Sequence, residues 1–265
     1  MTKYRLAWCS DIHFDFVRPD HRKRFLDSLV LTGADGVLIT GDISVSRRLA
    51  ESLGAIAAMG LPTYFVTGSH DYYTGSFAQT DAVIDSVCRQ HPTLVRLGHG
   101  EVIPLGEETV LIGHSGWGDG RAGIASQNAT RMFDSVLIAD LRLENRKLFE
   151  KLGELGWASA QYMERVAPAA ARRANRIVIA THVPPFAEAS RHQGGPGDPA
   201  YLPHFTNVSM GEALLKIARA FPHKEFLVLC GHTHERCEYR AADNLLVRVA
   251  KAQYGDPAIE DVLEF

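Results

Sequence analysis

The first third of the chain alternates short apolar runs with amphipathic segments. The apolar runs predict buried strands at 6–9, 37–40 and 63–66. The segments between them have apolar residues at helical spacing or a helix-favouring composition, which predicts helices at 20–31, 46–59 and about 77–88. Strand–helix alternation with short connections is typical of a parallel sheet in an α/β fold.

The pattern becomes less regular after Thr93. Short strands are predicted at 94–97, 102–105 and 109–113, with a turn at Gly106-Glu107-Glu108 between the last two. Helices are predicted at about 136–152, 158–175 and 210–220, and strands at 177–180, 226–230, 245–249 and 259–263. No repeat or linker divides the chain. We therefore expect a single domain over residues 1–265, with cap or insert elements at about 114–175 and 183–208.

The composition is that of an ordinary globular protein, with 46% hydrophobic and 22% charged residues. A formal net charge of -3 gives no electrostatic reason to expect nucleic-acid binding. No apolar run approaches the roughly 20 residues of a membrane span, and no signal-peptide pattern precedes the first strand. The four cysteines show no paired spacing, so we expect a reducing, cytoplasmic location.

Aspartate and histidine residues follow five of the predicted strands. In chain order they are Asp11 and His13, Asp42, His70 and Asp71, His182, and His232 and His234. Side chains just beyond the carboxyl ends of parallel strands meet at one edge of the sheet, so we expect these residues to lie together. One such residue alone would be interpreted as a cap or a satisfied polar group. Five strands that each end in this way predict a polynuclear metal site.

Histidine nitrogen and carboxylate oxygen together suit Mn, Fe and Zn better than Ca or Mg alone. Two such ions about 3.5–4 Å apart can clamp a phosphoryl group, generate a hydroxide and stabilise both the attacking and the leaving oxygen. The donors available here suffice for two ions that share one bridging carboxylate. We therefore expect two metal ions, with Mn, Fe or Zn favoured.

The same motifs resemble, in the same order, those of the calcineurin-like metallophosphoesterases. They are Asp11-x-His13, Gly41-Asp42, Gly68-Ser69-His70-Asp71, Thr181-His182 and Gly231-His232-Thr233-His234. The resemblance extends from Leu6 to about His234. It implies an α/β fold, a four-layer αββα sandwich, with a dinuclear metal site at the carboxyl-terminal edge of the strands.

The resemblance also implies the metal ligands. They are Asp11, His13 and His234 for the first ion, Asp42 as the bridge, and His182, His232 and the residue at position 69 for the second. Position 69 departs from the family pattern, because Ser69 stands where the family normally has Asn. A Ser hydroxyl is shorter than an Asn side chain and a poorer neutral donor. We predict a weaker or water-completed second site with the fold unchanged; natural divergence and an introduced substitution are both open as explanations.

Three residues are expected to take part in catalysis. Asp42 holds the bridging position, and the resemblance makes His70 the acid that protonates the leaving group or fixes the substrate phosphate. The adjacent Asp71 is expected to orient the His70 imidazole and to favour its protonated form.

Two further segments have open interpretations. His114, together with Trp117 or Asp119, either lines the pocket or opens a glycine-rich turn with a packed tryptophan. The loop at 191–205 follows the candidate ligand at the end of the preceding strand, and it either covers the substrate or packs its aromatic residues on the body. The arginines between 136 and 176 are interpreted as a solvated helical face, with a docking surface or cap as the alternative.

The resulting hypothesis is a metal-dependent phosphoesterase. A metal-bridging hydroxide near Asp42 would attack a phosphodiester or a small phosphate ester. The stretch from Gly41 to Arg47 lacks the second Asp and the Arg-Gly of the Ser/Thr protein phosphatases, which disfavours that activity and favours a small-molecule substrate. The alternatives are a non-catalytic metal-binding scaffold of the same fold, which Ser69 supports, and a nuclease, which the charge disfavours. The residues do not indicate an oligomeric state.

Overall fold

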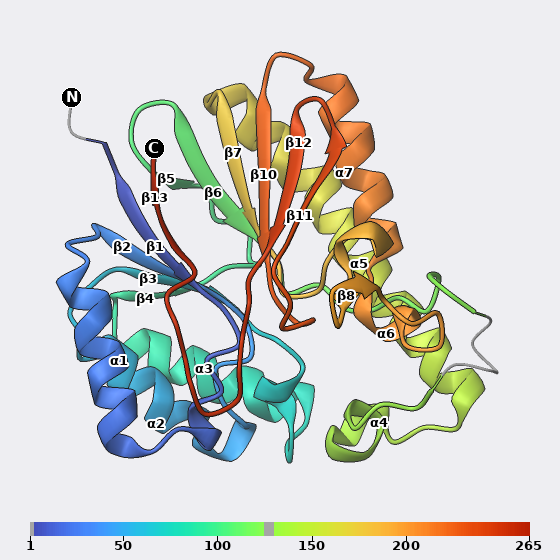
Figure 1. Ribbon diagram of the computed structural model, residues 1–265, viewed down its shortest axis with the longest axis horizontal. Helices are drawn as coiled ribbons and strands as arrows, with labels where there is room; N and C mark the ends of the chain where they lie inside the picture. The colour runs from blue at the N-terminus through green and yellow to red at the C-terminus, as the bar shows by residue number, and fades with distance from the viewer. Residues whose placement is uncertain (1–2, 125–129) are drawn as a thin grey trace.

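Two main sheets form the centre of the protein in the computed structural model, which describes residues 3–124 and 130–265 (Figure 1). The first sheet has the order β13-β1-β2-β3-β4, in which β1 to β4 are parallel and β13 is antiparallel to β1. Its strands are β1 (Arg5–Cys9), β2 (Gly36–Thr40), β3 (Thr63–Val66), β4 (Leu94–Arg96) and β13 (Asp261–Glu264).

The second sheet has the order β11-β12-β10-β7-β6-β5. The four inner strands are parallel, and each outer strand is antiparallel to its neighbour. Its strands are β5 (Ile103–Pro104), β6 (Thr109–Gly113), β7 (Arg176–Ala180), β10 (Glu225–Cys230), β11 (Cys237–Ala242) and β12 (Leu245–Val249).

Helices cover the outer face of each sheet (Figure 1). The first sheet carries α1 (Pro19–Leu31), α2 (Ser46–Ala57) and α3 (Phe77–Gln90), and the second carries α5 (Asn145–Arg173) and α7 (Val208–Ala220). The shorter helical elements are α4 (Asp134–Leu137), α6 (Leu202–Phe205), η1 (Phe14–Phe16), η2 (His70–Tyr72), η4 (Ala139–Leu141) and η5 (Ala187–Ala189).

Alternation along the strands divides the core into three layers. In β1, Leu6 belongs to the core between the sheets, whereas Ala7 belongs to the core under α1 to α3. In β7, Val178 faces the other sheet and Ile177 packs under α5 and α7. Two helical layers therefore enclose two sheets, and the predicted four-layer αββα sandwich is confirmed.

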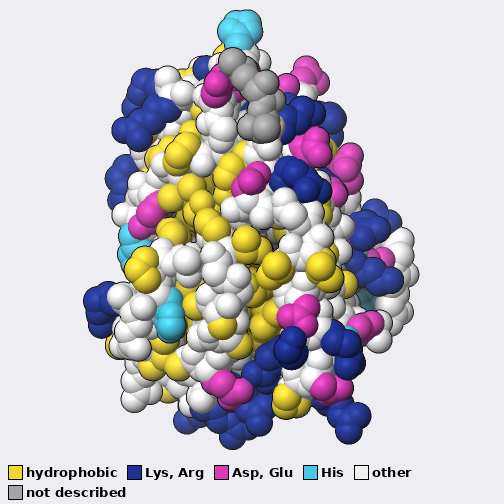
Figure 2. All heavy atoms as spheres, turned by 90° about the vertical axis from the view of Figure 1, so that its left-hand side faces the viewer, with side chains coloured by type: hydrophobic (Ala, Val, Ile, Leu, Met, Phe, Trp, Pro, Cys, Tyr) yellow, Lys and Arg dark blue, Asp and Glu magenta, His cyan; other side chains and the backbone are white. Residues whose placement is uncertain are grey.

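The core between the sheets is not completely closed off. Tyr4, Ile103 and Leu263 pack against it while they are only partly buried. Seen from the left-hand side of Figure 1, hydrophobic side chains gather along the middle of the molecule and charged ones around the rim (Figure 2). Such exposure is ordinary, because a folded protein has too little polar surface to cover itself.

The separation of 136–152 and 158–175 into two helices is wrong. Residues 145–173 form one continuous 29-residue helix, α5, and the residues before it belong to α4, η4 and irregular chain. Gly156, within the expected break, is a packing position, because a Cβ there would collide with Asp119. Burial of the apolar face of α5 outweighs the intrinsic cost of a helical glycine, about 1 kcal/mol.

Most other predicted elements agree with the observed ones to within about two residues at each end. The segment 183–208, expected as a loop, contains η5, α6 and a hairpin of β8 (Arg191–His192) and β9 (Gly195–Pro196). Strand β11 was not predicted, because its mixed sequence lacks an apolar run; it forms by pairing with β12. Residues 1–2 and 125–129, the latter inside the predicted insert at about 114–175, lie outside the described residues.

Within residues 3–124 and 130–265, we find no helix with the length and apolar character that crossing a membrane requires.

Candidate metal centre

The predicted ligands meet at the edge where parallel strands of both sheets end. They follow β1, β2, β3, β7 and β10 along the chain. The donor atoms of all of them except Ser69 form two groups, and within each group the atoms lie within 4.8 Å of one another. The first group is Asp11, His13, Asp42 and His234, and the second is Asp42, His182 and His232. Asp42 therefore belongs to both groups.

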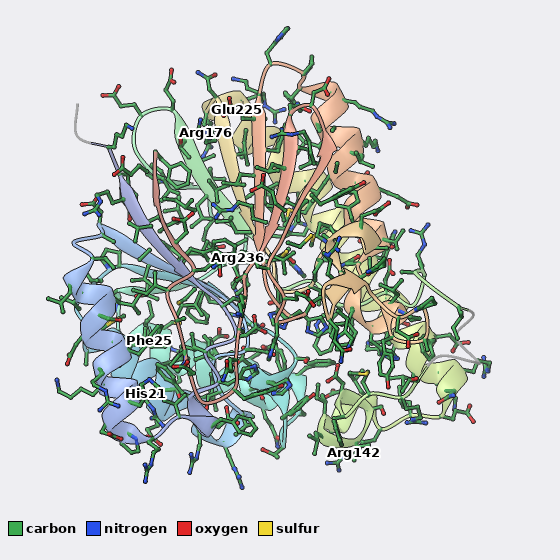
Figure 3. All side chains as sticks on the ribbon, in the orientation of Figure 1. His21, Phe25, Arg142, Arg176, Glu225 and Arg236 are labelled. Atoms are coloured by element: carbon green, nitrogen blue, oxygen red, sulfur yellow. The ribbon has the colours of Figure 1, made fainter. Side chains whose placement is uncertain are left out.

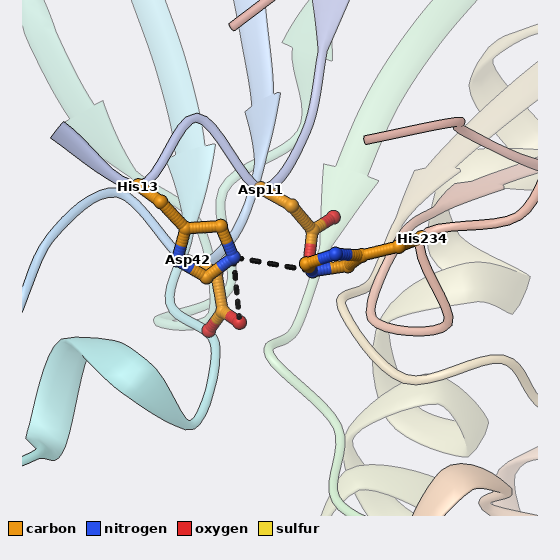
Figure 4. Close-up of side chains that lie close together, drawn as sticks. All are labelled: Asp11, His13, Asp42 and His234. Carbon is orange, nitrogen blue, oxygen red and sulfur yellow. Dashed lines mark hydrogen bonds and ion pairs between the residues drawn. The ribbon is translucent and has the colours of Figure 1, made fainter. Parts of the chain in front are cut away.

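The first group brings together two carboxylates and two imidazoles (Figure 4). The Nε2 atoms of His13 and His234 lie 3.1 Å apart. His13 Nε2 lies 3.7 Å from Asp42 Oδ2, and His234 Nε2 lies 3.3 Å from Asp11 Oδ1. All four side chains thus direct their donor atoms to one small volume.

The second group adjoins the first through the other oxygen of Asp42, which lies 3.3 Å from His182 Nε2. His182 Nδ1 lies 2.8 Å from the Thr40 carbonyl oxygen, so an Nδ1–H can donate a hydrogen bond to it. The lone pair of Nε2 is then free for a metal ion. His232 Nε2 makes the corresponding contact with the His204 carbonyl oxygen at 3.2 Å. His232 Nδ1 then lies 3.1 Å from His182 Nε2.

The backbone at these residues adopts an unusual conformation. Five residues of the two groups have left-handed backbones, with φ between 39° and 71°: Asp11, His13, Asp42, His232 and His234. This region is uncommon for residues other than glycine, and such strain concentrates at functional sites. These conformations occur in the loops that follow β1, β2 and β10.

Glycines allow the ligand loops to approach one another closely. A Cβ at Gly41 would collide with His182, one at Gly68 with Asp42, and one at Gly231 with Asp11. Gly41 also has a φ of 94°, which disfavours any side chain. Steric crowding therefore requires glycine at each of these three positions.

The electrostatics of the buried groups favour a cation at this edge. Burial opposes ionisation of Asp11, but the hydrogen bond from His234 and the charges of His182 and His234 together hold the pKa of Asp11 at about 2. Burial also opposes protonation of His182, yet the charge and hydrogen bond of Asp42, with the charge of Asp11, together raise the His182 pKa to about 10. The carboxylates therefore stay charged and attract positive charge.

Two other imidazoles are available as neutral nitrogen donors. Burial lowers the pKa of His13 to about 4, and burial together with the charge of His182 lowers that of His232 to about 3. His13 Nδ1 also has no hydrogen-bond partner among the described residues. Pairs of imidazole nitrogens 3.1 Å apart beside carboxylates form a donor set that fits divalent transition metals. These residues therefore fit the two metal ions that the sequence predicts.

Ser69 and His70 lie beside the two groups, at the turn after β3. Both line the cavity that contains Asp42, His232 and His234. The His70 backbone N–H donates to Asp42 Oδ1 at 2.9 Å. Its imidazole stacks on Tyr73, with ring centroids 4.1 Å apart and an interplanar angle of 25°.

The prediction that Asp71 orients the His70 imidazole is wrong. Asp71 Oδ1 accepts from the backbone N–H groups of Ile43 and Ser44, and Oδ2 accepts from that of Gly68. Consecutive side chains of the η2 turn point in different directions, so Asp71 faces the β2 loop instead of its neighbour. Burial, with the charge of Asp42, raises the pKa of Asp71 to about 7. Asp71 therefore ties together the loops that carry Asp42 and Ser69.

The cavity beside the donor groups has a volume of about 840 Å³. Several residues that line it were not predicted: Phe16, Arg47, Arg48, Tyr73, Asp134 and Tyr254. The Tyr254 ring lies 4.5 Å from that of His13 and 4.9 Å from that of His234. No local sequence signal marks Tyr254, because it reaches the site from the chain between β12 and β13.

The loop at 191–205 does reach the cavity, as expected from its start beside His182. His192 and Phe205 line it, and the Phe205 ring stacks on His232 with centroids 4.5 Å apart. A smaller cavity of about 330 Å³ adjoins, lined by Tyr201, Leu202 and Phe205 among others. The arginines of the helical segment are surface residues: Figure 3 places Arg142 beside α4 at the periphery.

His114, Trp117 and Asp119 do not line the cavity. His114 Nδ1 accepts the Gly116 N–H at 3.1 Å, and its ring lies against Tyr162. Trp117 packs in a core with Tyr72 and other apolar residues, and Asp119 accepts the Ser209 N–H at the start of α7. The glycine-rich turn with a packed tryptophan is thus the correct interpretation.

His114→Gln is expected to make the protein less sensitive to acid. Burial lowers the pKa of His114 to about 4 in the folded chain, whereas the unfolded value is about 6.5. Between these two pH values the unfolded state therefore binds more protons than the folded state. The contribution of neutral His114 to the free energy of unfolding is complete above pH 6.5 and is lost as the pH falls towards 4. Between pH 7 and 4.5, the variant should lose about 2–3 kcal/mol less than the wild type.

Urea unfolding at both pH values measures this difference. His223→Gln is the matched control, because His223 is exposed. A His114→Gln protein with the acid sensitivity of the control would contradict the prediction.

The fold and the paired donor groups define a two-sheet α/β protein equipped for a dinuclear metal centre. The family model for calcineurin-like phosphoesterase matches residues 4–236. The chain therefore belongs to the calcineurin-like phosphoesterase family, and the predicted resemblance is confirmed.

Individual relatives are more distant. The UDP-2,3-diacylglucosamine hydrolase of Xanthomonas campestris is 32% identical over 80 residues, which are 25% of this chain and 32% of the relative. The match thus spans about a third of the relative's length. A dimetal phosphatase from Danio rerio shares the fold, with a TM-score of 0.54, 12% identity and coverage of 94% of this chain and 87% of the other. Protein TT1561 of Thermus thermophilus does so with a TM-score of 0.51, 15% identity and coverage of 94% and 90%.

Proposed function

We propose that this protein is a metal-dependent hydrolase of small phosphate esters that prefers phosphodiesters. The observation that carries the proposal is the shared position of Asp42, with one oxygen 3.7 Å from His13 Nε2 and the other 3.3 Å from His182 Nε2. A carboxylate common to two donor groups is what a pair of adjacent cations requires. When bound, two such cations supply positive charge for the phosphoryl oxygens and lower the pKa of a water molecule.

The ligands in this proposal are those expected from the sequence. The first ion is held by Asp11, His13 and His234, the second by His182, His232 and Ser69, and Asp42 contributes to both. The Thr40 carbonyl oxygen supports this arrangement, because its contact with His182 Nδ1 directs Nε2 towards Asp42.

His70 acts on the substrate in this proposal. Its imidazole lines the cavity and is stacked on Tyr73, and its Nδ1 has no hydrogen-bond partner among the described residues. The His70 backbone N–H donates a 2.9 Å hydrogen bond to Asp42, which fixes the position of the His70 backbone relative to the bridging carboxylate. His70 either gives a proton to the leaving oxygen or holds the phosphate.

The substrate class follows from the cavity and the motif. A volume of about 840 Å³ is larger than a phosphate group needs and suits a small organic ester. The stretch from Gly41 to Arg47 lacks the second Asp and the Arg-Gly of protein phosphatases. The relative named as a UDP-2,3-diacylglucosamine hydrolase supports a hydrolase with a small-molecule substrate.

Hydrolysis of two chromogenic esters tests the proposal. Chelator-stripped protein is assayed on bis(p-nitrophenyl) phosphate and p-nitrophenyl phosphate, alone and with Mn, Fe, Zn or Mg. We expect turnover only after metal is added, with the diester hydrolysed faster. Full turnover by the stripped protein, or none with any metal, would reject the function.

Ser69→Asn is expected to strengthen binding of the second metal ion. Ser69 is buried at the cavity, next to a donor group that has three charged or imidazole ligands where the first group has four. An Asn carbonyl oxygen adds a longer neutral donor, which should tighten the weaker Mn site about tenfold, or about 1.4 kcal/mol. Calorimetric titration of stripped protein measures this, with Ser69→Ala as the control. Equal second-site affinity in the wild type and Ser69→Asn would sink the idea.

A further inference from the structure

Two arginines occupy one wall of the cavity beside the donor groups. Arg47 and Arg48 line the same cavity as Asp42 and His70, and both are exposed. Within residues 3–124 and 130–265 neither forms an ion pair with a carboxylate. Arg48 makes one long contact, 3.4 Å, to the Asp15 backbone oxygen. Both guanidinium groups are therefore available to a bound molecule.

The backbone that carries these arginines is held firmly relative to Asp42. Asp71 accepts the backbone N–H groups of Ile43 and Ser44, at 2.8 and 2.9 Å. The Ser46 N–H donates to the Tyr73 carbonyl oxygen at 3.2 Å, and α2 begins at Ser46. The arginines thus follow the bridging carboxylate at a defined position in the first turn of α2.

This position is electrostatically unfavourable for arginine. A helix N-terminus carries partial positive charge and favours acidic residues. The first turn of α2 contains no acidic residue, and its N-cap, Val45, provides no side-chain acceptor. The first turn of α5 also carries a basic pair, Arg146 and Lys147, but these residues form ion pairs with Glu150 and Glu144. Unlike the pair on α5, Arg47 and Arg48 line the cavity and have no ion-pair partner among residues 3–124 and 130–265.

Two carboxylates that line the cavity outside the donor groups, Asp15 and Asp134, are not paired with these arginines. Asp134 accepts a hydrogen bond from the Tyr73 hydroxyl at 2.6 Å. Asp15 is partly buried, and one of its oxygens has no partner among the described residues. Neither carboxylate forms an ion pair with Arg47 or Arg48 within residues 3–124 and 130–265. Arg47 and Arg48 therefore present unpaired positive charge to this side of the cavity.

We propose that Arg47 and Arg48 bind a second phosphate group of the substrate, beside the phosphate that is hydrolysed. This inference rests on the proposed function of the adjacent site. Arginine forms paired hydrogen bonds with phosphate oxygens, and the helix N-terminus adds its own positive potential. Exposed Phe16 and Tyr254, 57% and 48% accessible, line the same cavity and suit the organic part that joins the two phosphates. The favoured substrate is a small phosphate ester with an additional terminal phosphate.

A matched pair of substrates tests this proposal. Thymidine 5′-(p-nitrophenyl phosphate) and its 3′-phosphorylated derivative have the same leaving group and differ only in the second phosphate. In the wild type, the derivative should have a kcat/KM higher by about tenfold or more. In Arg47→Ser/Arg48→Ser the ratio should fall to about one, and in Arg47→Lys/Arg48→Lys part of the preference should return. Added salt should weaken the wild-type preference, because exposed charges are screened.

Arg172→Ser/Arg173→Ser is the matched control. These residues form an adjacent, exposed arginine pair at the end of α5, outside the cavity, so the control loses the same charge and should keep the wild-type ratio. Thermal unfolding supplies a second measurement: Arg47→Ser/Arg48→Ser should melt no lower than the wild type, because it relieves repulsion at the start of α2.

The outcomes are distinguishable. A wild-type ratio near one, or a ratio that survives in Arg47→Ser/Arg48→Ser, overturns the second-phosphate site while the hydrolase stands. A lower melting temperature together with a uniform loss on both substrates makes the arginines structural and also overturns it. No turnover of either thymidine ester or of bis(p-nitrophenyl) phosphate with any metal rejects the proposed function itself.

Discussion

Asp42→Asn is expected to lower kcat/KM for bis(p-nitrophenyl) phosphate by about 10³-fold or more. The Asp42 oxygens face His13 and His182 on opposite sides, so one substitution removes the negative charge that both donor groups share. The charge stabilisation that two bound cations provide is worth several kcal/mol, and each 1.36 kcal/mol is about tenfold in rate. Steady-state kinetics with metal content measured on the same samples tests this expectation.

The matched control is Asp27→Asn, which removes the same charge from the exposed face of α1. It should leave kcat/KM and metal content unchanged. Circular dichroism of Asp42→Asn should match the wild type, since amide and carboxylate have the same shape and the His70 N–H keeps an acceptor. An Asp42→Asn enzyme that is fully metal-loaded and within tenfold of wild-type activity would refute the bridging role.

His70→Gln is expected to lower kcat by about 10²–10⁴-fold for substrates with poor leaving groups, the range for a positioned general acid. The imidazole lines the cavity and is stacked on Tyr73, whereas the metal-donor groups do not include it. Metal content should therefore stay at the wild-type value. Rates on a p-nitrophenyl diester and an alkyl diester, measured side by side, test the role.

The leaving-group dependence separates the two functions open for His70. A general acid matters most when the departing oxygen is basic, so the alkyl ester should lose more activity than the p-nitrophenyl ester. Equal losses on both esters would assign His70 to holding the phosphate. His91→Gln, on the chain after α3, is the control and should be unaffected. Unchanged rates in His70→Gln would remove His70 from the mechanism.

Local pattern was sufficient for most of the fold. Strands β3 and β6 begin and end at the predicted residues, because each is a short apolar run bounded by polar or glycine residues. The predictions failed where distant contacts decide the structure. Gly156 does not interrupt α5, because burial of the apolar face of this helix outweighs the cost of the glycine, and β11 forms through its pairing with β12.

The site shows the same division. The donor residues were identifiable because they recur after five strands in a fixed order. The contact of Tyr254 with His13 and His234 was not identifiable, since nothing in its neighbourhood marks it. The wrong prediction for Asp71 has a related cause: adjacency in sequence says little about where a side chain points once the chain turns.

By itself, the sequence determined the chemistry of the donors, their order and the type of fold, because apolar periodicity and motif order are properties of the linear chain. The tertiary structure alone decided which donors share a volume. His13 and His234 are 221 positions apart, yet their nitrogens lie 3.1 Å from each other. The packing of the two sheets creates that proximity. The tertiary fold also brings the Asp71 carboxylate to the backbone of Ile43 and places Arg47 and Arg48 beside the same cavity.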